Sequence, residues 1–540
     1  MSRNLSKDPV SPELRQIETE LDSFHRANPL MQLPFGIAAW YFMAFCEDDV
    51  FINYEQGRIK SIQDAAIFAD RFVVHLKNAF LWLHNACPGG RFVQPEHDPR
   101  YYQAGWDLSV LSEHYDPFEW AFTYASRGLI DLSLHHLTIE PSKELFKVLR
   151  YEMYDRLAKT AEINFQYNIM ELYRLVASSL MVDGSKFAYQ LNPKVVANAM
   201  ELLDCIVDQR YSLPQHWKLS QYSIGDFRRI SKCLVTMSFL HYAARILAAN
   251  SQCEGLGYDS SILVMSTNEL TNRLARYSGC STSVVTAFVE DLTYGSRGIA
   301  KPDPALQPLI QLGGNTYGIM PNLWINSSVE RNFIVLMNRL PEERAIYSCL
   351  VGEKESLMKQ WIVDSISIDG LRHFSGSVPG NSGYGDIDLA LIDDNEKSCL
   401  FLELKWFVEP AEVREMIEKS EEIGKGISQL ETLSELIERK PAPYFAALRI
   451  DASYRRFFAV ASDSYIGMAD VQNPNIPVVR HRHLVSRMNQ LNSLEAVCGW
   501  MGRNEYLPVE GTHFETREKV WTVGRWSIKW YSMMPLVDSI

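Results

Sequence analysis

Apolar residues recur every three or four positions through most of residues 60–250, which is the spacing of one face of an α-helix. The longest run starts at Ile62 and stops at Cys87-Pro88-Gly89-Gly90, because proline and glycine end helices. A separate apolar run from Pro34 predicts a buried helix closed by Glu47-Asp48-Asp49. Further helices are predicted near 117–137, 142–159, 165–182, 193–208 and 226–250. Residues 1–260 are therefore expected to form a mainly helical domain.

Residues 91–116 interrupt the helical pattern and are predicted to form a loop rich in aromatic residues. Such a loop could stack on nucleic-acid bases, or it could fill a helical layer, and we favour the second. The pair His135-His136 has no second pair at zinc-binding spacing, and Glu201 and Asp204 fit the solvated face of a helix. These residues give the N-terminal half no candidate chemistry.

The pattern changes between residues 261 and 340. Helices are predicted at 268–277 and 283–292 on either side of Gly279-Cys280-Ser281, followed by a hairpin at 309–320. This order resembles a winged-helix unit. The second helix would read DNA in such a unit, but it contains no Arg or Lys, so a structural or protein-contact role is favoured.

Predicted helices and strands alternate between residues 341 and 540, which is typical of an α/β domain. The first helix is expected from Pro341 to Ile366, with an inner apolar stripe at Ile346, Leu350, Leu357 and Trp361. Glu353 falls on this stripe, where a carboxylate is costly unless it is paired or metal-bound, while Glu355 points elsewhere. A half-exposed position after Gly352 is an equally weighted alternative for Glu353. The other predicted elements are strands at 371–378, 445–450, 457–461 and 476–484, a helix at 411–439 and a hairpin at 512–533.

The strand predicted at 476–484 contains Arg480, His481, Arg482 and His483. Strand alternation would place both arginines on one face and both histidines on the other. The arginine face could bind phosphate, or it could be a basic edge that discourages aggregation.

Two strands with period-two alternation flank the polar turn 394–397. If this is a two-residue hairpin loop at Asn395 and Glu396, the numbers of facing residues sum to about 791. Asp388 then lies opposite Glu403, and Lys405 lies two residues further along the same face. Three charged side chains therefore converge on one part of an otherwise apolar hairpin.

Neighbouring carboxylates in an apolar setting repel, so at least one would be driven toward protonation. A divalent cation removes this conflict, and oxygen ligands of this kind suit Mg²⁺ or Mn²⁺. The lysine would then polarise a water molecule or hold a phosphate oxygen. Asp386 shares the face of Asp388 and could add a second oxygen or lie in water. An ordinary surface ion pair is the simpler alternative, but the complete pattern favours a metal site.

These residues resemble the PD-(D/E)xK nuclease superfamily, which has the restriction-endonuclease-like fold. Its pattern is an acid on a first helix, an Asp on the second strand, Glu-x-Lys on the third, and then a helix that often carries Gln or a basic residue. Asp388 matches the Asp, Glu403 and Lys405 match Glu-x-Lys, and Glu353 would be the helix acid. On the last helix Gln429 is a better match than Lys425. The Pro of the family name is absent, and the match covers roughly residues 341–490.

The resemblance implies an α/β domain with a mixed central sheet that hydrolyses phosphodiester bonds with Mg²⁺ or Mn²⁺. Asp388, Glu403 and the backbone carbonyl of Leu404 would hold the metal with Glu353, and Lys405 would orient the attacking water. The substrate would be a nucleic acid, with DNA favoured over RNA. Antiviral defence and nucleic-acid processing are settings in which members of this superfamily act.

Composition and charge limit the kinds of surface, compartment and partner that are expected. The 540 residues carry a net charge of −13, which excludes a broad basic surface, so a nucleic acid would have to meet a local basic cleft or the metals. The nine cysteines include no Cys-x-x-Cys pair, as expected in a reducing cytoplasm. The start has no signal-peptide core, and no membrane association is expected.

The sequence therefore predicts a multidomain α+β protein with a helical domain at 1–260, a winged-helix-like or connecting module at 261–340 and a nuclease-like domain at 341–540. A non-catalytic scaffold with a degenerate nuclease fold is the alternative, favoured by the acidic charge and the large helical half. That half could bind a protein partner or a second copy of the chain. A transcriptional regulator is disfavoured by the uncharged second helix of the middle module.

Overall fold

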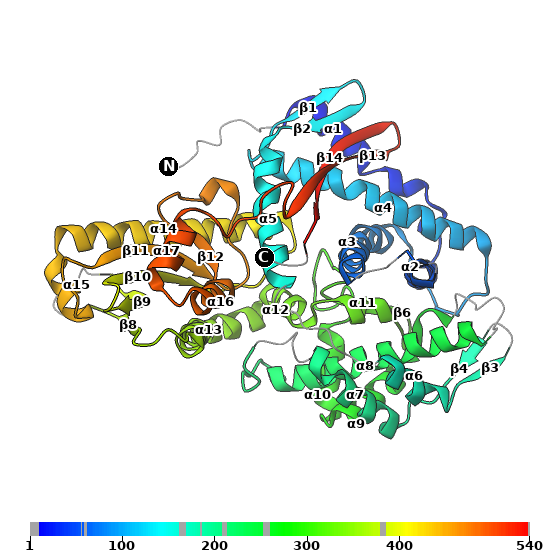
Figure 1. Ribbon diagram of the computed structural model, residues 1–540. Helices are drawn as coiled ribbons and strands as arrows, with labels where there is room; N and C mark the ends of the chain where they lie inside the picture. The colour runs from blue at the N-terminus through cyan, green and yellow to red at the C-terminus, as the bar shows by residue number, and fades with distance from the viewer. Residues whose placement is uncertain are drawn as a thin grey trace.

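The computed structural model describes residues 10–55, 57–58, 62–160, 169–183, 186–207, 213–251, 260–378 and 385–537. Helices and separate sheets form an α+β protein, which confirms the predicted class at this level. Three regions lie next to one another in Figure 1: the N-terminal helices, a helical layer from the middle of the chain, and a five-stranded sheet with its covering helices. Within the described ranges, no helix combines the length and the apolar content needed to cross a membrane.

The N-terminal helices are α1 (Pro12–Leu21), α2 (Phe35–Glu55), α3 (Ile62–Ala86) and α4 (Pro99–Ser126). The buried helix predicted from Pro34 is found as α2, but it does not end at Glu47-Asp48-Asp49. Glu47 accepts hydrogen bonds from the backbone N–H of Asn322 at 2.9 Å and from its side-chain amide at 2.6 Å, and Asp48 pairs with Arg245. Because these partners satisfy the buried acids, the helix continues through them.

The loop predicted at 91–116 is wrong, because most of this segment lies in α4. Asp98 caps the helix and Pro99 occupies its first turn, and both are helix-start signals that the aromatic residues obscured. Tyr101 packs against α2, with its ring centroid 5.4 Å from that of Tyr41. This packing agrees with the interpretation that the aromatic residues fill a helical layer.

The middle of the chain is helical, as predicted, with α5 (Glu144–Thr160), α6 (Ile169–Ala177), α7 (Pro193–Val207) and α8 (Ile224–Asn250). The helix expected at 117–137 ends at Ser126 instead. The chain then forms the hairpin of β1 (Leu132–His135) and β2 (Thr138–Pro141). His135-His136 lies at this turn, with φ of 57° at His136. A second small hairpin joins β3 (Met181–Asp183) and β4 (Lys186–Ala188).

The helices and hairpin predicted between 261 and 340 are confirmed. The elements are β5 (Leu263–Ser266), α9 (Thr267–Ser278), α10 (Thr282–Asp291), β6 (Leu309–Gly313) and β7 (Thr316–Ile319). The strands form one sheet in the order β5-β7-β6, and α9 and α10 lie between β5 and β6 in the chain. Two helices, α11 (Pro321–Asn326) and α12 (Val329–Arg339), then lead into the next region.

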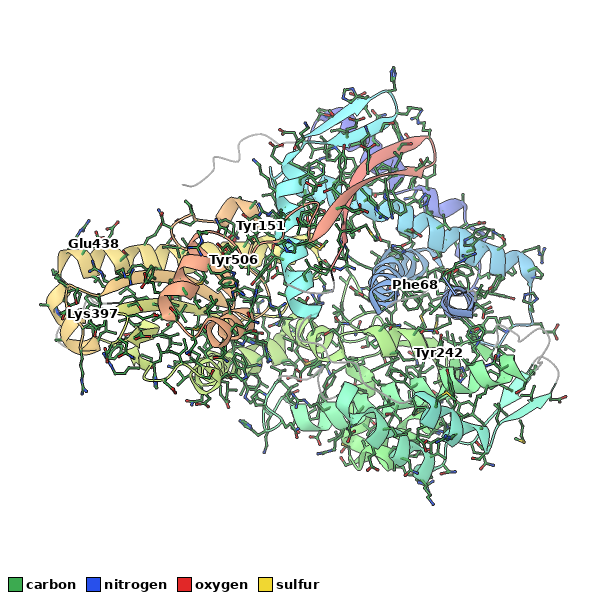
Figure 2. The ribbon with its side chains drawn as sticks, in the orientation of Figure 1. Phe68, Tyr151, Tyr242, Lys397, Glu438 and Tyr506 are labelled. Carbon is green, nitrogen blue, oxygen red and sulfur yellow. The ribbon has the colours of Figure 1, made fainter. Side chains whose placement is uncertain are left out.

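The five-stranded sheet has the order β12-β11-β10-β9-β8. Its strands are β8 (Arg372–Gly376), β9 (Ile387–Asp393), β10 (Ser398–Lys405), β11 (Arg455–Ser462) and β12 (Val478–Arg480). Strands β8, β9 and β10 pair antiparallel, and β10, β11 and β12 pair parallel, so the sheet is mixed. The helix α13 (Pro341–Ser365) precedes β8, and the long helix α14 (Val413–Arg439) follows β10. Lys397 in the β9–β10 turn and Glu438 at the end of α14 lie at the same outer end of this region (Figure 2).

Two strands expected in this region are wrong. Residues 445–450 lie mostly in the helix α15 (Pro441–Leu448), because Pro441 and Pro443 favour a helix start and Arg449 ends the helix in the left-handed conformation. The strand expected at 476–484 is limited to β12, and the helix α16 (His481–Leu491) follows, with α17 (Leu494–Gly502) after it. Alternating arginine and histidine faces therefore do not form.

The hairpin predicted at 512–533 is confirmed as β13 (Phe514–Val523) and β14 (Trp526–Pro535). It does not belong to the five-stranded sheet that precedes it in sequence. Strand β14 pairs parallel with β2, at Ser527 opposite Thr138 and Ile528 opposite Ile139. The last strands thus complete a sheet with residues 132–141, whereas the sequence had grouped them with residues 341–540.

Candidate active site

The register predicted for the β9–β10 hairpin is confirmed. Pairing starts at Asp393 opposite Ser398, and the numbers of facing residues sum to 791 throughout. The turn spans 394–397 instead of two residues, because the Asp393 carboxylate accepts hydrogen bonds from two backbone N–H groups of the turn, at 2.9 and 3.0 Å. Asp388 and Glu403 are the next positions beyond the last regular pair of this register.

Asp388, Glu403 and Lys405 meet at the inner end of the hairpin. The Lys405 ammonium lies 2.7 Å from Oε1 of Glu403. The Asp388 carboxylate accepts a hydrogen bond at 2.9 Å from the backbone N–H of Leu404, which lies between the other two residues in sequence. Glu403 is only 7% exposed, and the side chains of Asp388 and Lys405 are half-buried. The structure therefore brings these three predicted site residues together.

Gln429 reaches the same cluster from α14. Its Oε1 accepts a hydrogen bond from the Lys405 ammonium at 3.1 Å. Lys425, one turn earlier on the helix, is exposed. The Lys405 ammonium is thus held between a carboxylate on its own strand and an amide on the neighbouring helix.

The buried carboxylate of Glu403 has an unusual protonation equilibrium. Desolvation, followed by repulsion from the Asp388 carboxylate, raises the pKa of Glu403 to about 7, although the Lys405 ammonium lowers it. Each contribution acts as expected for a desolvated acid beside one like and one opposite charge. The cluster thus places two carboxyl groups beside a single ammonium group.

A third carboxylate faces this cluster, and it belongs to Glu355. Its pKa is raised by desolvation and by the Asp388 carboxylate, and it is lowered by the Lys405 ammonium. Glu355 in turn contributes to the raised pKa of Glu403. The expectation that Glu353 is the helix acid at this site is corrected: Glu353 accepts a hydrogen bond at 2.7 Å from the Trp217 indole on the other side of α13.

Glu355 replaces Glu353 at the cluster because the buried face of α13 is rotated by about one residue, or roughly 100°, from the predicted apolar stripe. Leu357, expected on the inner face, is 43% exposed, whereas Lys354 and Met358 are buried. The Lys354 ammonium lies 4.7 Å from the ring centroid of Trp406, which allows a charged residue to occupy the inner face. A stripe that included Lys354 would have identified Glu355 from the sequence.

Asp386 adds little to the described cluster. Asp386 is exposed and accepts a hydrogen bond from the Ser377 hydroxyl, so it is held at the mouth of the strand. The sequence 379–383, Pro-Gly-Asn-Ser-Gly, predicts a flexible loop beside the site, and it lies outside the described residues.

The donor set fits a hard divalent cation. Among the described residues, no group of three His, Cys, Asp or Glu side chains is arranged closely enough to bind a metal on its own. Mg²⁺, however, commonly takes only one or two protein carboxylates and fills its other positions with water and substrate phosphate. Asp388 and Glu403 supply these two carboxylates, and the raised pKa of Glu403 shows that the position favours a neutralising charge.

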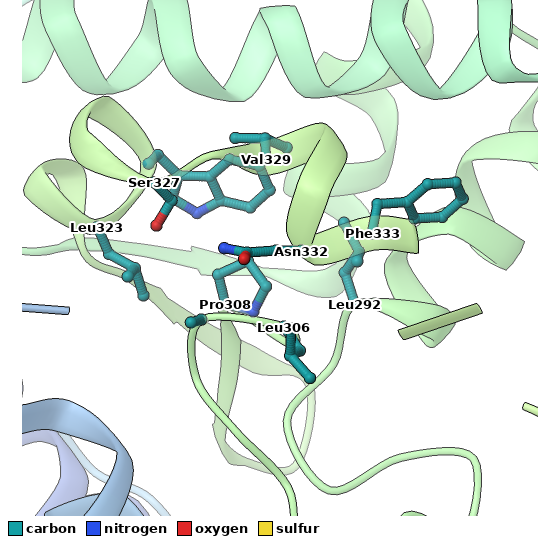
Figure 3. A pocket seen from close by; sticks show the side chains of 10 residues that line it. Leu292, Leu306, Pro308, Leu323, Ser327, Val329, Asn332 and Phe333 are labelled. Atoms are coloured by element: carbon teal, nitrogen blue, oxygen red, sulfur yellow. The ribbon is translucent and has the colours of Figure 1, made fainter. Parts of the chain in front are cut away.

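Two cavities among the described residues lie away from this cluster. One apolar pocket of about 10 Å³ is enclosed by residues such as Leu306, Leu323 and Phe333, and it has room for about one water molecule (Figure 3). A larger cavity of about 390 Å³ is lined mostly by polar residues of α9 and α10, among them Thr271, Thr286 and Glu290. Neither cavity includes a residue of the Asp388 cluster, so the case for chemistry rests on the side chains themselves.

Comparison of the chain with protein-family models, with curated proteins and with solved structures found no match.

Proposed function

We propose that this protein is a metal-dependent nuclease that hydrolyses phosphodiester bonds, with Asp388, Glu403 and Lys405 at its active site. The observation that carries the proposal is the meeting of two carboxylates and an ammonium at the ends of β9 and β10, where the pKa of Glu403 is raised to about 7. A buried like-charge pair is costly in an isolated protein but useful where a cation binds.

Mg²⁺ or Mn²⁺ is the cofactor that this donor set favours. Asp388 and Glu403 would hold it with the carbonyl of Leu404, and Glu355 faces them from α13. When bound, the cation would lower the pKa of a water molecule and offset the charge of the phosphate. DNA is the favoured substrate, and RNA is the alternative.

Among the side chains of the site, Lys405 has the best-defined catalytic role in this proposal. Its ammonium donates to Glu403 at 2.7 Å and to Gln429 at 3.1 Å, which fixes its position at the edge of the cluster. Held there, it would orient the attacking water and stabilise negative charge on the phosphate as the bond breaks. Gln429 acts through Lys405 and is a positioning residue.

The order of elements also supports the proposal. A helix, three antiparallel strands, a long helix, the short helix α15 and a parallel strand follow one another from α13 to β11. The acids lie on the first helix and the second and third strands, and Gln429 lies on the long helix. This is the order that a resemblance to the PD-(D/E)xK superfamily implies, with Glu355 taking the place first given to Glu353.

A non-catalytic scaffold is the second candidate, and one observation favours it. The Lys405–Glu403 ion pair already satisfies part of the buried charge without a metal. In that case the cluster would be a relic that contributes to stability, and nucleic acid would not be cleaved.

Incubation of the pure protein with labelled DNA and RNA, in Mg²⁺, Mn²⁺ or EDTA, tests the proposed function. We expect cleavage of DNA with either metal and none with EDTA. Cleavage that continues in EDTA would contradict the metal-dependent mechanism, and intact substrates under all conditions would favour the scaffold.

A further inference from the structure

Gly426 lies in the middle of α14, on its buried face. Glycine is the least favourable residue for a helix interior apart from proline, because it gains nothing from packing and loses the most backbone freedom. The other buried residues of this face are mostly large and apolar, as expected for a helix that covers a sheet. The position therefore needs a reason for having no side chain.

The reason lies in the path of Lys405. A Cβ atom placed on Gly426 would be 2.8 Å from Cε of Lys405 and 3.3 Å from Cγ of Glu403. The first distance is shorter than carbon atoms tolerate, so the lysine chain runs directly over the bare backbone of α14. Beyond this crossing, the ammonium reaches Glu403 at 2.7 Å and Gln429 at 3.1 Å.

We propose that Gly426 is a positioning residue that lets Lys405 cross α14 and place its ammonium between Glu403 and Gln429. The proposal deepens the nuclease function proposed above and rests on it for its catalytic consequence. A methyl group at residue 426 would push the end of a flexible lysine chain aside. The fold would tolerate this movement, but the ammonium would leave its place.

Gly424, two residues earlier on the same helix, supplies a matched control. A Cβ on Gly424 would lie 3.7 Å from the nearest side-chain atom, which belongs to Val471, and this is an ordinary van der Waals distance. Gly424→Ala and Gly426→Ala therefore make the same chemical change in one helix, and only the second one meets Lys405.

Cleavage and melting temperature should be measured for both alanine variants, each with and without Lys405→Ala. We expect Gly424→Ala to raise the melting temperature and leave cleavage unchanged. Gly426→Ala should lower cleavage on the order of 100-fold, the loss typical of a displaced catalytic group, and should add no further loss to Lys405→Ala.

The melting temperatures decide the proposal even if the protein does not cleave nucleic acid. Gly426→Ala should raise the melting temperature less than Gly424→Ala in the wild-type chain, and by a similar amount once Lys405 is alanine, because the obstructing chain is then gone. Additive effects on melting temperature would overturn the positioning role. If the effect of Gly426→Ala on melting temperature depends on Lys405 but the wild type cleaves no nucleic acid, the positioning role is upheld. Only the nuclease function is then contradicted.

Discussion

Glu403 is a buried acid beside a second carboxylate, and this makes the stability of the protein depend on pH. The pKa of Glu403 is raised from about 4.5 in the unfolded chain to about 7 in the folded protein. Between these values the folded state keeps a proton that the unfolded state has released, so stability falls as pH rises. Glu403→Gln removes this dependence.

We therefore expect the melting temperature of Glu403→Gln, relative to the wild type, to increase from pH 5 to pH 8 in metal-free buffer. Thermal unfolding followed by circular dichroism at several pH values measures this difference. A difference that stays constant with pH would show that Glu403 has an ordinary pKa.

The proposed metal site uses Glu403 together with Asp388. Titration calorimetry with Mn²⁺ should detect a site in the wild type that is lost in Asp388→Ala and in Glu403→Gln, because each change removes one of two carboxylate ligands. Asp386→Ala is the control, since Asp386 is exposed and held by Ser377. Unchanged binding in both site variants would rule out this metal site.

At the scale of elements, α13 offers two glutamates with different surroundings. Glu355 faces Asp388 and Lys405, whereas Glu353 is bonded to the Trp217 indole. Glu355→Gln should lower metal-dependent cleavage by about tenfold or more, in line with the loss of one electrostatic group. Glu353→Gln should leave the cleavage rate unchanged. Initial rates of the two variants, compared at equal metal concentration, test this, and a larger loss in Glu353→Gln would restore the original assignment.

Local patterns determined the β9–β10 hairpin well. Its register followed from the alternation of apolar residues and the polar turn, so Asp388, Glu403 and Lys405 could be placed together from the sequence. The rotation of α13 was missed because a stripe of apolar residues alone leaves out Lys354, whose place on the inner face depends on its contact with Trp406. Helix α15 was missed because an apolar run of about six residues suits a strand or a helix equally.

At the scale of the whole molecule, the C-terminal hairpin joins the end of the chain to the N-terminal helices. Ile528 and Ile139 face each other across β14 and β2, and both are 0% exposed. Such pairing between residues nearly 400 positions apart leaves no trace in a local pattern. The hairpin itself was predictable, and its partner strand was not.

Ile528→Ala should therefore destabilise the protein by about 2–5 kcal/mol, as expected for truncating a fully buried side chain. Val520, on the other strand of the same hairpin, is 58% exposed, so Val520→Ala should change the stability very little. Urea unfolding followed by tryptophan fluorescence compares the two. Equal effects would mean that the hairpin does not pack against β2.

The central claim is that Lys405 belongs to an active site and does not merely balance buried charge. The measurement that tests it most directly is Mg²⁺-dependent cleavage of labelled DNA by the wild type and by Lys405→Ala, with the melting temperature recorded on the same samples. We predict that Lys405→Ala stays folded and cleaves on the order of 10²- to 10⁴-fold more slowly, the range for loss of a catalytic acid–base or electrostatic group. Cleavage by Lys405→Ala at the wild-type rate would contradict the account.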